Sequence, residues 1–375
     1  MKIAILSPFY PYRGGLAQLN ARLYTELSKQ NEVKAYTFTT LYPNVLFPGK
    51  TQYVQDGDPV TVIDSIRILN SVNPLSYIKT AKLINKYSPD LLIIPYWMSF
   101  LAPAYGSVCM FLNKKTKVVS LVHNAISHER TIIDKPLAKF FFNRCDAFIV
   151  MSKPVKKDLL TLRKDANILL QPHPIYDQYA ERIEKEEACD KLGIKSDKKN
   201  LLFFGLIRDY KGLDLLIEAM SEFDNSYQLI IAGESYGSFD KYATLINQSS
   251  LKDNIVVFEQ YIPDDMVSTL FSASDALVLP YRSATQSGVV ALAYQMELPM
   301  IATNVGALGT TVKESGTGLV VPQPTHSDIA KGIKDFFDQN NNIEEYRKNL
   351  KKEKKRLSWD NFTKSIESFF HSLKN

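Results

Sequence analysis

Short apolar runs alternate with amphipathic stretches along nearly the whole of this 375-residue chain. Near-continuous apolar runs, separated by stretches with helical spacing, are typical of parallel strands that are buried on both faces. The alternation therefore predicts an α/β protein built on doubly wound parallel sheets. In the first half we predict strands at 2–6, 33–38, 91–94, 118–122 and 147–151 and helices at 16–29, 75–86 and 154–162. In the second half we predict strands at 201–204, 228–232, 255–258, 276–279, 300–302 and 318–321.

The length of the chain exceeds what a single hydrophobic core usually holds, so two domains are expected. Residues 1–175 form the first predicted domain and residues 200–355 the second. The charged stretch 176–199 is interpreted as the linker between them, and residues 356–375 as a C-terminal helix.

A cationic loop follows the first predicted strand of the second half. The apolar run stops at Gly205, and Arg208 and Lys211 precede a helical pattern that starts near Gly212. Free backbone N–H groups and the helix dipole at such a start point the same way as the cationic side chains, which favours a bound anion. Strand–loop–helix units occur in every α/β protein, so this loop indicates an anion site only together with a second one.

A second candidate loop follows the predicted strand 276–279. It opens at Pro280, is small and polar, and leads into an apolar helical stretch. Small residues let a backbone approach a ligand closely, and the following helix again offers unpaired N–H groups. The alternative is an ordinary connection between a strand and a helix. The residues of this loop that we expect to bind the ligand are Thr285, Gln286, Ser287, Gly288 and Val289.

Five segments carry a family resemblance through their order and spacing. They are KIAILSPFYPYRGGLAQLN at the start, VVSLVHNAISHER, DAFIVMSKPVKKDL, LIIAGE and YIPDDMVSTLFSASDALVLPY. With them the chain resembles a retaining glycosyltransferase of the GT-B fold, family four, over nearly its whole length. The resemblance implies two Rossmann-like domains facing a central cleft, with the final segment crossing back onto the first domain.

The resemblance also implies roles for individual residues. Gly14 and Gly15 would open a tight loop that faces the reacting sugar, and His123 would touch the transferred sugar. For His123, the alternative is a histidine that caps the end of a strand. Gly205 and Glu234 match positions at the donor.

Arg208, Lys211 and His123 are the candidate catalytic residues. Breaking a sugar–phosphate bond places negative charge on the departing diphosphate. Fixed cations aimed at that group stabilise the transition state more than the ground state. No dedicated base is implied by a retaining mechanism.

The chain departs from the family pattern in two places. The family's donor loop carries two glutamates, and the matching positions here hold Ala284 and Leu292. The family's arginine directly follows the glycine that Gly205 matches, whereas here Leu206 stands there and Arg208 comes two residues later. The chain therefore resembles a divergent branch with a TQSG loop, whose hydroxyl and amide groups are candidates to replace the missing hydrogen bonds. A sugar-nucleotide epimerase of the same fold and a degenerate, binding-only relative are the alternatives.

Charge is distributed unevenly along the chain. Residues 1–175 hold 22 Lys and Arg against 11 Asp and Glu, a net charge of +11, while the other 200 residues hold 23 against 29, a net charge of −6. Such asymmetry points to an anionic partner for the first half. Anionic membrane headgroups would suit it, and the alternative is that helix surfaces simply carry lysine. No nucleic-acid recognition motif accompanies the charge.

By resemblance, the partners are a nucleoside-diphosphate-sugar donor and a glycan or lipid-linked acceptor, in the synthesis of bacterial cell-surface polysaccharide. We expect no cofactor and no metal. Asp56 and Asp58 have the spacing of a metal-binding pair, but turns favour Asp and Gly. The three cysteines, Cys109, Cys145 and Cys189, show no metal or redox spacing.

One uncharged stretch, residues 91–112, is long enough to span a bilayer. Pro95, Pro103 and Gly106 interrupt it, so a strand followed by a helix packed on the sheet is the favoured interpretation. The apolar run at the start is too short for a signal peptide, which predicts a cytoplasmic protein. Peripheral contact with the inner face of the cell membrane is the extension that the basic first half suggests.

Overall fold

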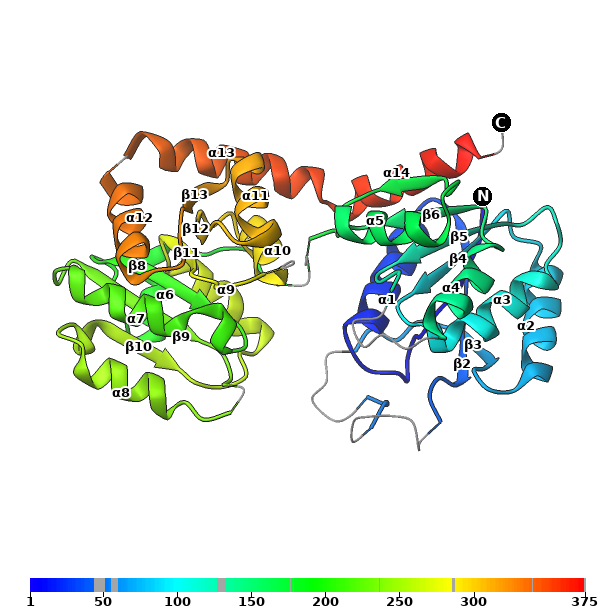
Figure 1. The fold of residues 1–375 in the computed structure, drawn as a ribbon, viewed down its shortest axis with the longest axis horizontal. Helices are drawn as coiled ribbons and strands as arrows, with labels where there is room; N and C mark the ends of the chain where they lie inside the picture. The colour runs from blue at the N-terminus through cyan, green and yellow to red at the C-terminus, as the bar shows by residue number, and fades with distance from the viewer. Residues whose placement is uncertain are drawn as a thin grey trace. The chain divides into compact units, whose positions relative to one another are not determined.

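The computed structural model describes residues 1–43, 51–54, 60–126, 133–175, 177, 179–235, 237–284, 287–338 and 340–373. The chain divides into two compact units. Unit 1 comprises Met1–His173 and Trp359–Asn375, and unit 2 comprises Pro174–Ser358. In each of them, helices cover a parallel sheet (Figure 1).

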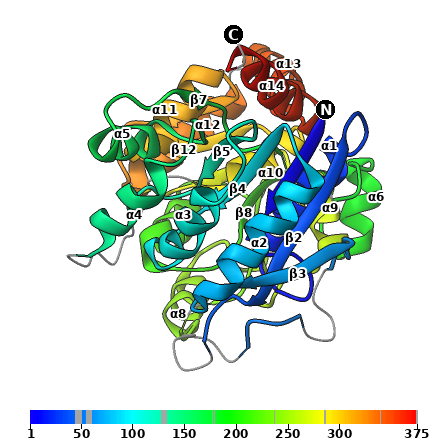
Figure 2. The ribbon, with the colours of Figure 1, turned by 90° about the vertical axis from the view of Figure 1, so that its right-hand side faces the viewer.

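Unit 1 is built on a seven-stranded sheet with the order β3-β2-β1-β4-β5-β6-β7, and β3 beside β2 can be followed in Figure 2. Every neighbouring pair is parallel. The strands are β1 (Lys2–Leu6), β2 (Glu32–Thr40), β3 (Ser65–Asn70), β4 (Leu91–Tyr96), β5 (Lys117–Val122), β6 (Ala147–Val150) and β7 (Ile168–Leu170). The helices are α1 (Gly15–Leu27), α2 (Pro74–Tyr87), the 3-10 turn η2 (Ser99–Leu101), α3 (Ala102–Met110), α4 (Asp134–Phe142), α5 (Lys153–Leu162) and α14 (Trp359–Ser372).

Alternate residues of the strands in unit 1 face two different cores. Ile3 and Ile5 of β1 belong to the core under α1 and α14, whereas Ala4 and Leu6 belong to the core under α2, α3 and α4. In β4, with the sequence LLIIPY, all six residues are buried. A strand covered by helices on both faces has no polar side, which is why these runs are continuously apolar.

The last helix, α14, belongs to unit 1 although α13 before it belongs to unit 2. Its buried Trp359 and Phe362 join the same core as α1. The Arg22 guanidinium lies 5.2 Å from the ring centroid of Trp359. Asn31 Nδ2 donates to Glu367 Oε1 at 2.6 Å.

Unit 2 has a six-stranded parallel sheet with the order β10-β9-β8-β11-β12-β13. In the central strand β8, Leu201 and Phe203 face the core formed with α7, α8 and α12. Leu202 and Phe204 of the same strand face the core that includes α9, α10 and α11. The strands are β8 (Lys199–Phe204), β9 (Tyr227–Ala232), β10 (Ile255–Phe258), β11 (Ala276–Leu279), β12 (Met300–Thr303) and β13 (Gly318–Val321). The helices are α6 (Lys185–Leu192), α7 (Leu213–Ala219), α8 (Asp240–Gln248), α9 (Asp264–Ser272), α10 (Gly288–Gln295), α11 (Gly306–Ser315), α12 (His326–Asp338) and α13 (Asn340–Arg356), with 3-10 turns η3 (Asp209–Lys211), η4 (Met220–Glu222) and η5 (Lys252–Asn254).

The α/β architecture with two doubly wound parallel sheets confirms the predicted fold class. Two strands were not predicted, β3 and β7. β3 is an edge strand with exposed Ile66 and Arg67, and β7 has only three residues, all half-buried. In β3, Arg67 interrupts the apolar run, because an edge strand faces water on one side. The strand β7 is apolar throughout but only three residues long, so the pattern does not single it out.

The segment predicted to be a linker, 176–199, instead contains α6 and belongs to unit 2. Its charged residues suggested an exposed connection, but Ala188 and Cys189 are buried in the core of unit 2. A short helix that contributes only a few core residues is mostly charged, and composition alone does not distinguish it from a linker.

The uncharged stretch 91–112 folds as β4, η2 and α3, which confirms a strand followed by a helix. Among the helices that the structure describes, none combines the length and hydropathy of a membrane span. Asp56 and Asp58 lie outside the described residues.

Candidate functional site

The strand order of unit 2 reverses direction at β8. From β8 the chain first adds β9 and β10 on one side, and then adds β11, β12 and β13 on the other. The connections that leave the carboxyl ends of β8 and β11 therefore lead to opposite halves of the sheet. Ligands of doubly wound sheets bind at such a point. Both candidate loops of the sequence begin here: one follows β8 at Gly205, the other follows β11 at Pro280.

Two glycines bring the backbones at this edge unusually close. Gly212 has φ +67°, and a Cβ on it would lie 2.1 Å from the carbonyl oxygen of Pro280. Gly233, at the end of β9, has φ +152°, and a Cβ there would lie 2.3 Å from the carbonyl oxygen of Gly205. No other residue type fits at these positions, so the three loops pack directly against one another.

Lys211 is the buried cation of this edge. The residue is 7% exposed, and its Nζ lies 3.3 Å from the position that a Cβ on Gly205 would occupy. The Nζ lies 5.8 Å from the ring centroid of Tyr281. Within the part of the chain that the structure describes, neither a hydrogen-bond acceptor nor a carboxylate offsets its charge. Burial, and secondarily the nearby Arg208, lower the pKa of Lys211 from 10.5 to about 8.

The N-terminus of α10 reaches the same point from the other loop. Val289 Cγ2 lies 3.5 Å from the Cβ position on Gly205 that Lys211 Nζ also approaches. Ser287 precedes the helix, and its Oγ lies 3.3 Å from the hydroxyl oxygen of Tyr281. An anion at this helix start would meet both unpaired N–H groups and a buried ammonium group.

Arg282 fixes the two loops to each other. Its guanidinium donates to both carboxylate oxygens of Asp214 at 2.8 and 2.7 Å, and to the carbonyl oxygen of Asp209 at 2.9 Å. Because Asp209 begins η3 and Lys211 ends it, this bidentate pair holds the turn that carries Lys211. Sequence reasoning missed Tyr281 and Arg282, although the PYR that follows β11 contains an aromatic and a cationic residue at the expected edge.

The other predicted residues of unit 2 have different environments. Arg208 and Gly288 are exposed at the two loops. Glu234 is also exposed, and its carbonyl oxygen accepts from the N–H of Ile207 at 2.8 Å. Thr285 and Gln286 lie outside the described residues.

The two positions that match the family's glutamates carry no polar side chain. Leu292 is 7% exposed and belongs to the core of unit 2, so α10 presents an apolar side chain there. Ala284 contributes its carbonyl oxygen, which would lie 1.8 Å from a Cβ on Gly306.

Unit 1 holds the remaining candidates. His123 directly follows β5, and its N–H donates to the carbonyl oxygen of Tyr96 at 2.8 Å. Its Nε2 is buried and has no hydrogen-bond partner among the described residues. Burial, and secondarily His173, lower the pKa of His123 to about 4, so the imidazole is neutral at pH 7. Gly14, with φ +104°, and Gly15 form the start of α1, with nothing within 4 Å of an added Cβ.

Two family models match consecutive stretches of the chain. The model "Glycosyltransferase Family 4" matches residues 13–176, and the model "Glycosyl transferases group 1" matches residues 184–357. An uncharacterized glycosyltransferase of Methanocaldococcus jannaschii is 24% identical over 381 residues, which cover 100% of this chain and 99% of that protein. The D-inositol 3-phosphate glycosyltransferase of Corynebacterium aurimucosum is 26% identical over 210 residues, 52% of this chain and 49% of that protein.

Solved structures share the fold over the whole chain. Sucrose-phosphate synthase from Thermosynechococcus elongatus superposes with a TM-score of 0.69 at 19% identity, over 99% of this chain and 98% of that one. Anabaena HepE in complex with UDP superposes with a TM-score of 0.68 at 15% identity, over 99% of this chain and 100% of that one. At these identities the likeness concerns the architecture.

Proposed function

The chain is a glycosyltransferase of the GT-B fold, and we propose that it moves a sugar from a nucleoside-diphosphate sugar to a glycan or lipid-linked acceptor with retention of the anomeric configuration. The setting we propose is the synthesis of a cell-surface polysaccharide. HepE was solved in complex with UDP. For this chain we propose that unit 2 binds the nucleoside diphosphate.

The observation that carries this proposal is the environment of Lys211. A lysine that is 7% exposed at the carboxyl edge of a sheet, beside a helix start, is costly for the empty protein. A diphosphate would supply the missing counter-charge. In the reaction this diphosphate departs with growing negative charge, and a fixed ammonium group aimed at it stabilises the transition state most.

His123 supports the proposal from unit 1. Its pKa of about 4 keeps the ring neutral, so Nε2 can share a hydrogen bond with a sugar hydroxyl without adding charge. We propose that His123 contacts the transferred sugar, and that Arg208 adds a second, exposed cation near the diphosphate.

Thermal unfolding in the presence of UDP, GDP, ADP and dTDP tests the donor assignment. One nucleotide is expected to raise the melting temperature of the wild-type chain, because a ligand present at about 100 times its Kd stabilises the folded state by about 2.7 kcal/mol. The shift should disappear in Lys211→Met and persist in Lys313→Met, which removes an exposed lysine of α11. If Lys211→Met retains the full shift, the diphosphate does not bind at Lys211.

The same protein and nucleotide sugar distinguish the alternatives. A transferase consumes the matching nucleotide sugar in the presence of an acceptor and hydrolyses it slowly without one. An epimerase converts the sugar with no acceptor present. A binding-only relative shows the melting shift with neither reaction, and either of these results would replace the transferase assignment.

Nucleotide binding is expected to take up protons near pH 8. The free lysine has a pKa of about 8, and an adjacent diphosphate raises that pKa, so about half a proton is bound per complex at pH 8. Affinity should therefore fall as the pH rises through 8, by up to about tenfold per pH unit. Calorimetry in buffers of different ionisation enthalpy measures the uptake. Lys313→Met should keep the full uptake. A wild-type complex that forms at pH 8 without proton uptake would show that the diphosphate does not bind beside Lys211.

A further inference from the structure

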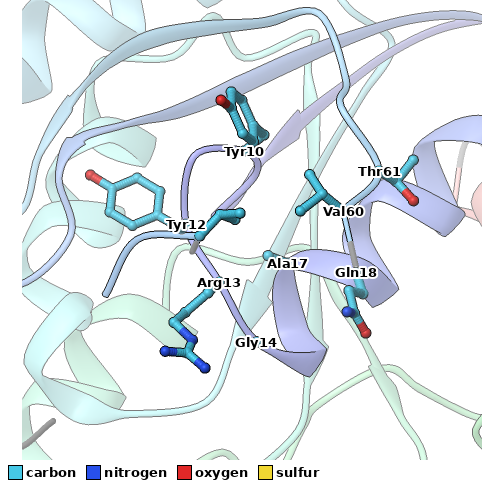
Figure 3. A pocket seen from close by; sticks show the side chains of 9 residues that line it. Tyr10, Tyr12, Arg13, Gly14, Ala17, Gln18, Val60 and Thr61 are labelled. Carbon is cyan, nitrogen blue, oxygen red and sulfur yellow. The ribbon is translucent and has the colours of Figure 1, made fainter. Parts of the chain in front are cut away.

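A cavity of about 150 Å³ lies in unit 1 at the start of α1. Figure 3 shows its lining side chains, among them Tyr10, Arg13, Gln18 and Thr61. The cavity is small beside the roughly 300–1,000 Å³ of pockets for drug-sized ligands, so one ring is the size of ligand that it fits.

The wall of the cavity is built from two segments far apart in sequence. Tyr12 and Tyr53 form an antiparallel bridge, and Val54 N donates to the carbonyl oxygen of Pro11 at 2.9 Å. Gln52, on the same segment, exchanges two hydrogen bonds with the backbone of Tyr42, at 3.2 and 2.9 Å. These contacts tie the loop after β1 to the end of β2, so the cavity is held in shape by backbone pairing.

Two tyrosines that line the cavity, Tyr12 and Tyr10, differ in how exposed they are. Tyr12 is buried, stacks on Tyr53 with ring centroids 5.4 Å apart, and donates its hydroxyl to the carbonyl oxygen of Phe38 at 3.3 Å. Tyr10 is 43% exposed and lines the same cavity. An exposed aromatic ring beside a rigid aromatic wall is a surface for another flat, partly apolar group.

The polar lining completes a pattern that suits a sugar. Arg13, Gln18 and Thr61, whose side chains end in guanidinium, amide and hydroxyl groups, line the cavity, and none of its described lining residues is acidic. The two faces of a pyranose ring carry C–H groups that pack on an aromatic ring, while its rim carries hydroxyls that need hydrogen-bond partners. Apolar groups with a few convergent polar ones are the usual composition of a small-molecule site.

We propose that this cavity binds the pyranose ring at the end of the acceptor, stacked on Tyr10 with its hydroxyls on Arg13, Gln18 and Thr61. The acceptor then ends in a sugar, rather than in a lipid phosphate without one. This inference rests on the proposed function, because it names the acceptor of that transfer.

Saturation-transfer NMR on the full chain tests the inference with the methyl pyranosides of glucose, galactose, mannose and N-acetylglucosamine as probes. At least one pyranoside is expected to receive saturation, and Tyr10→Ala should weaken its binding about tenfold. Tyr261→Ala removes another exposed tyrosine, in unit 2, and should leave the binding within about twofold of wild type. If Tyr10→Ala does not fold, Tyr10→Leu and Gln18→Ala carry the same expectation of weaker binding.

Two results would overturn the assignment of the cavity. One is that no pyranoside binds at millimolar concentration, and the other is that Tyr10→Ala and Tyr261→Ala bind equally well. The Lys211→Met variant tests the two sites independently, because it should no longer bind the nucleotide but should still bind the pyranoside. Conversely, if no nucleotide binds the wild type, the proposed function fails while the sugar site is judged on its own data.

Discussion

Lys211→Met is expected to be more stable than the wild-type protein and to have almost no transfer activity. The pKa of Lys211 is lowered from 10.5 to about 8, so folding disfavours its charged form. At about 1.36 kcal/mol per pKa unit, this costs about 3 kcal/mol at pH 7, where both the folded and the unfolded lysine are mostly protonated. Methionine has a similar length and no charge, so it removes this cost.

The sign of the pH dependence makes this prediction specific. The folded pKa lies below the unfolded one, so the penalty is fully present below pH 8 and disappears as the pH rises from 8 towards 10.5. Urea unfolding should show the variant more stable by about 3 kcal/mol at pH 7 and by only about 1 kcal/mol at pH 9.5. Lys313→Met should stay within about 0.5 kcal/mol of wild type at both pH values.

Activity should change in the opposite direction to stability. Removing one preorganised charge aimed at a developing anion typically costs about 100- to 1,000-fold in kcat. If the variant is both more stable and inactive, Lys211 binds the ligand but lowers the stability of the folded protein. A Lys211→Met protein that is less stable and fully active would show that the lysine has a structural role.

Gly212→Ala is expected to destabilise unit 2 severely, whereas Gly193→Ala should be mild. The two glycines have nearly the same backbone conformation, with φ +67° and +66°. An alanine in this left-handed region costs about 1–2 kcal/mol at either position. At Gly193 nothing lies within 4 Å of the new Cβ, but at Gly212 the carbonyl oxygen of Pro280 lies 2.1 Å from it.

The difference between these two variants measures the close approach of the two loops alone. We expect Gly212→Ala to lose at least about 3 kcal/mol of unfolding free energy, together with the nucleotide-dependent melting shift. Gly193→Ala should lose about 1 kcal/mol and keep the shift. Equal losses in the two proteins would mean that the loops separate freely, and that the contact between Gly212 and Pro280 does not shape the site.

The candidate site was only partly predictable from the sequence. Gly205, Arg208, Lys211 and the helix start after Ser287 were recognised because each belongs to a local strand–loop–helix pattern. Tyr281 and Arg282 were not, because their partners, Ser287 and Asp214, are visible only in the folded chain. The burial of Lys211 could not be predicted from the sequence either, because the exposure of a lysine in a loop depends on which distant segments pack against it.

The sequence by itself determined the alternation of strands and helices, and with it the two doubly wound sheets, because a strand buried on both faces must be apolar along its whole length. The tertiary structure alone decided which distant segments meet. It placed α6 in unit 2 and α14 against α1, and it brought the loop that follows β8 into contact with the loop that follows β11. Periodicity reports the environment of a residue within one element, whereas these contacts join residues many positions apart and depend on packing and strand order.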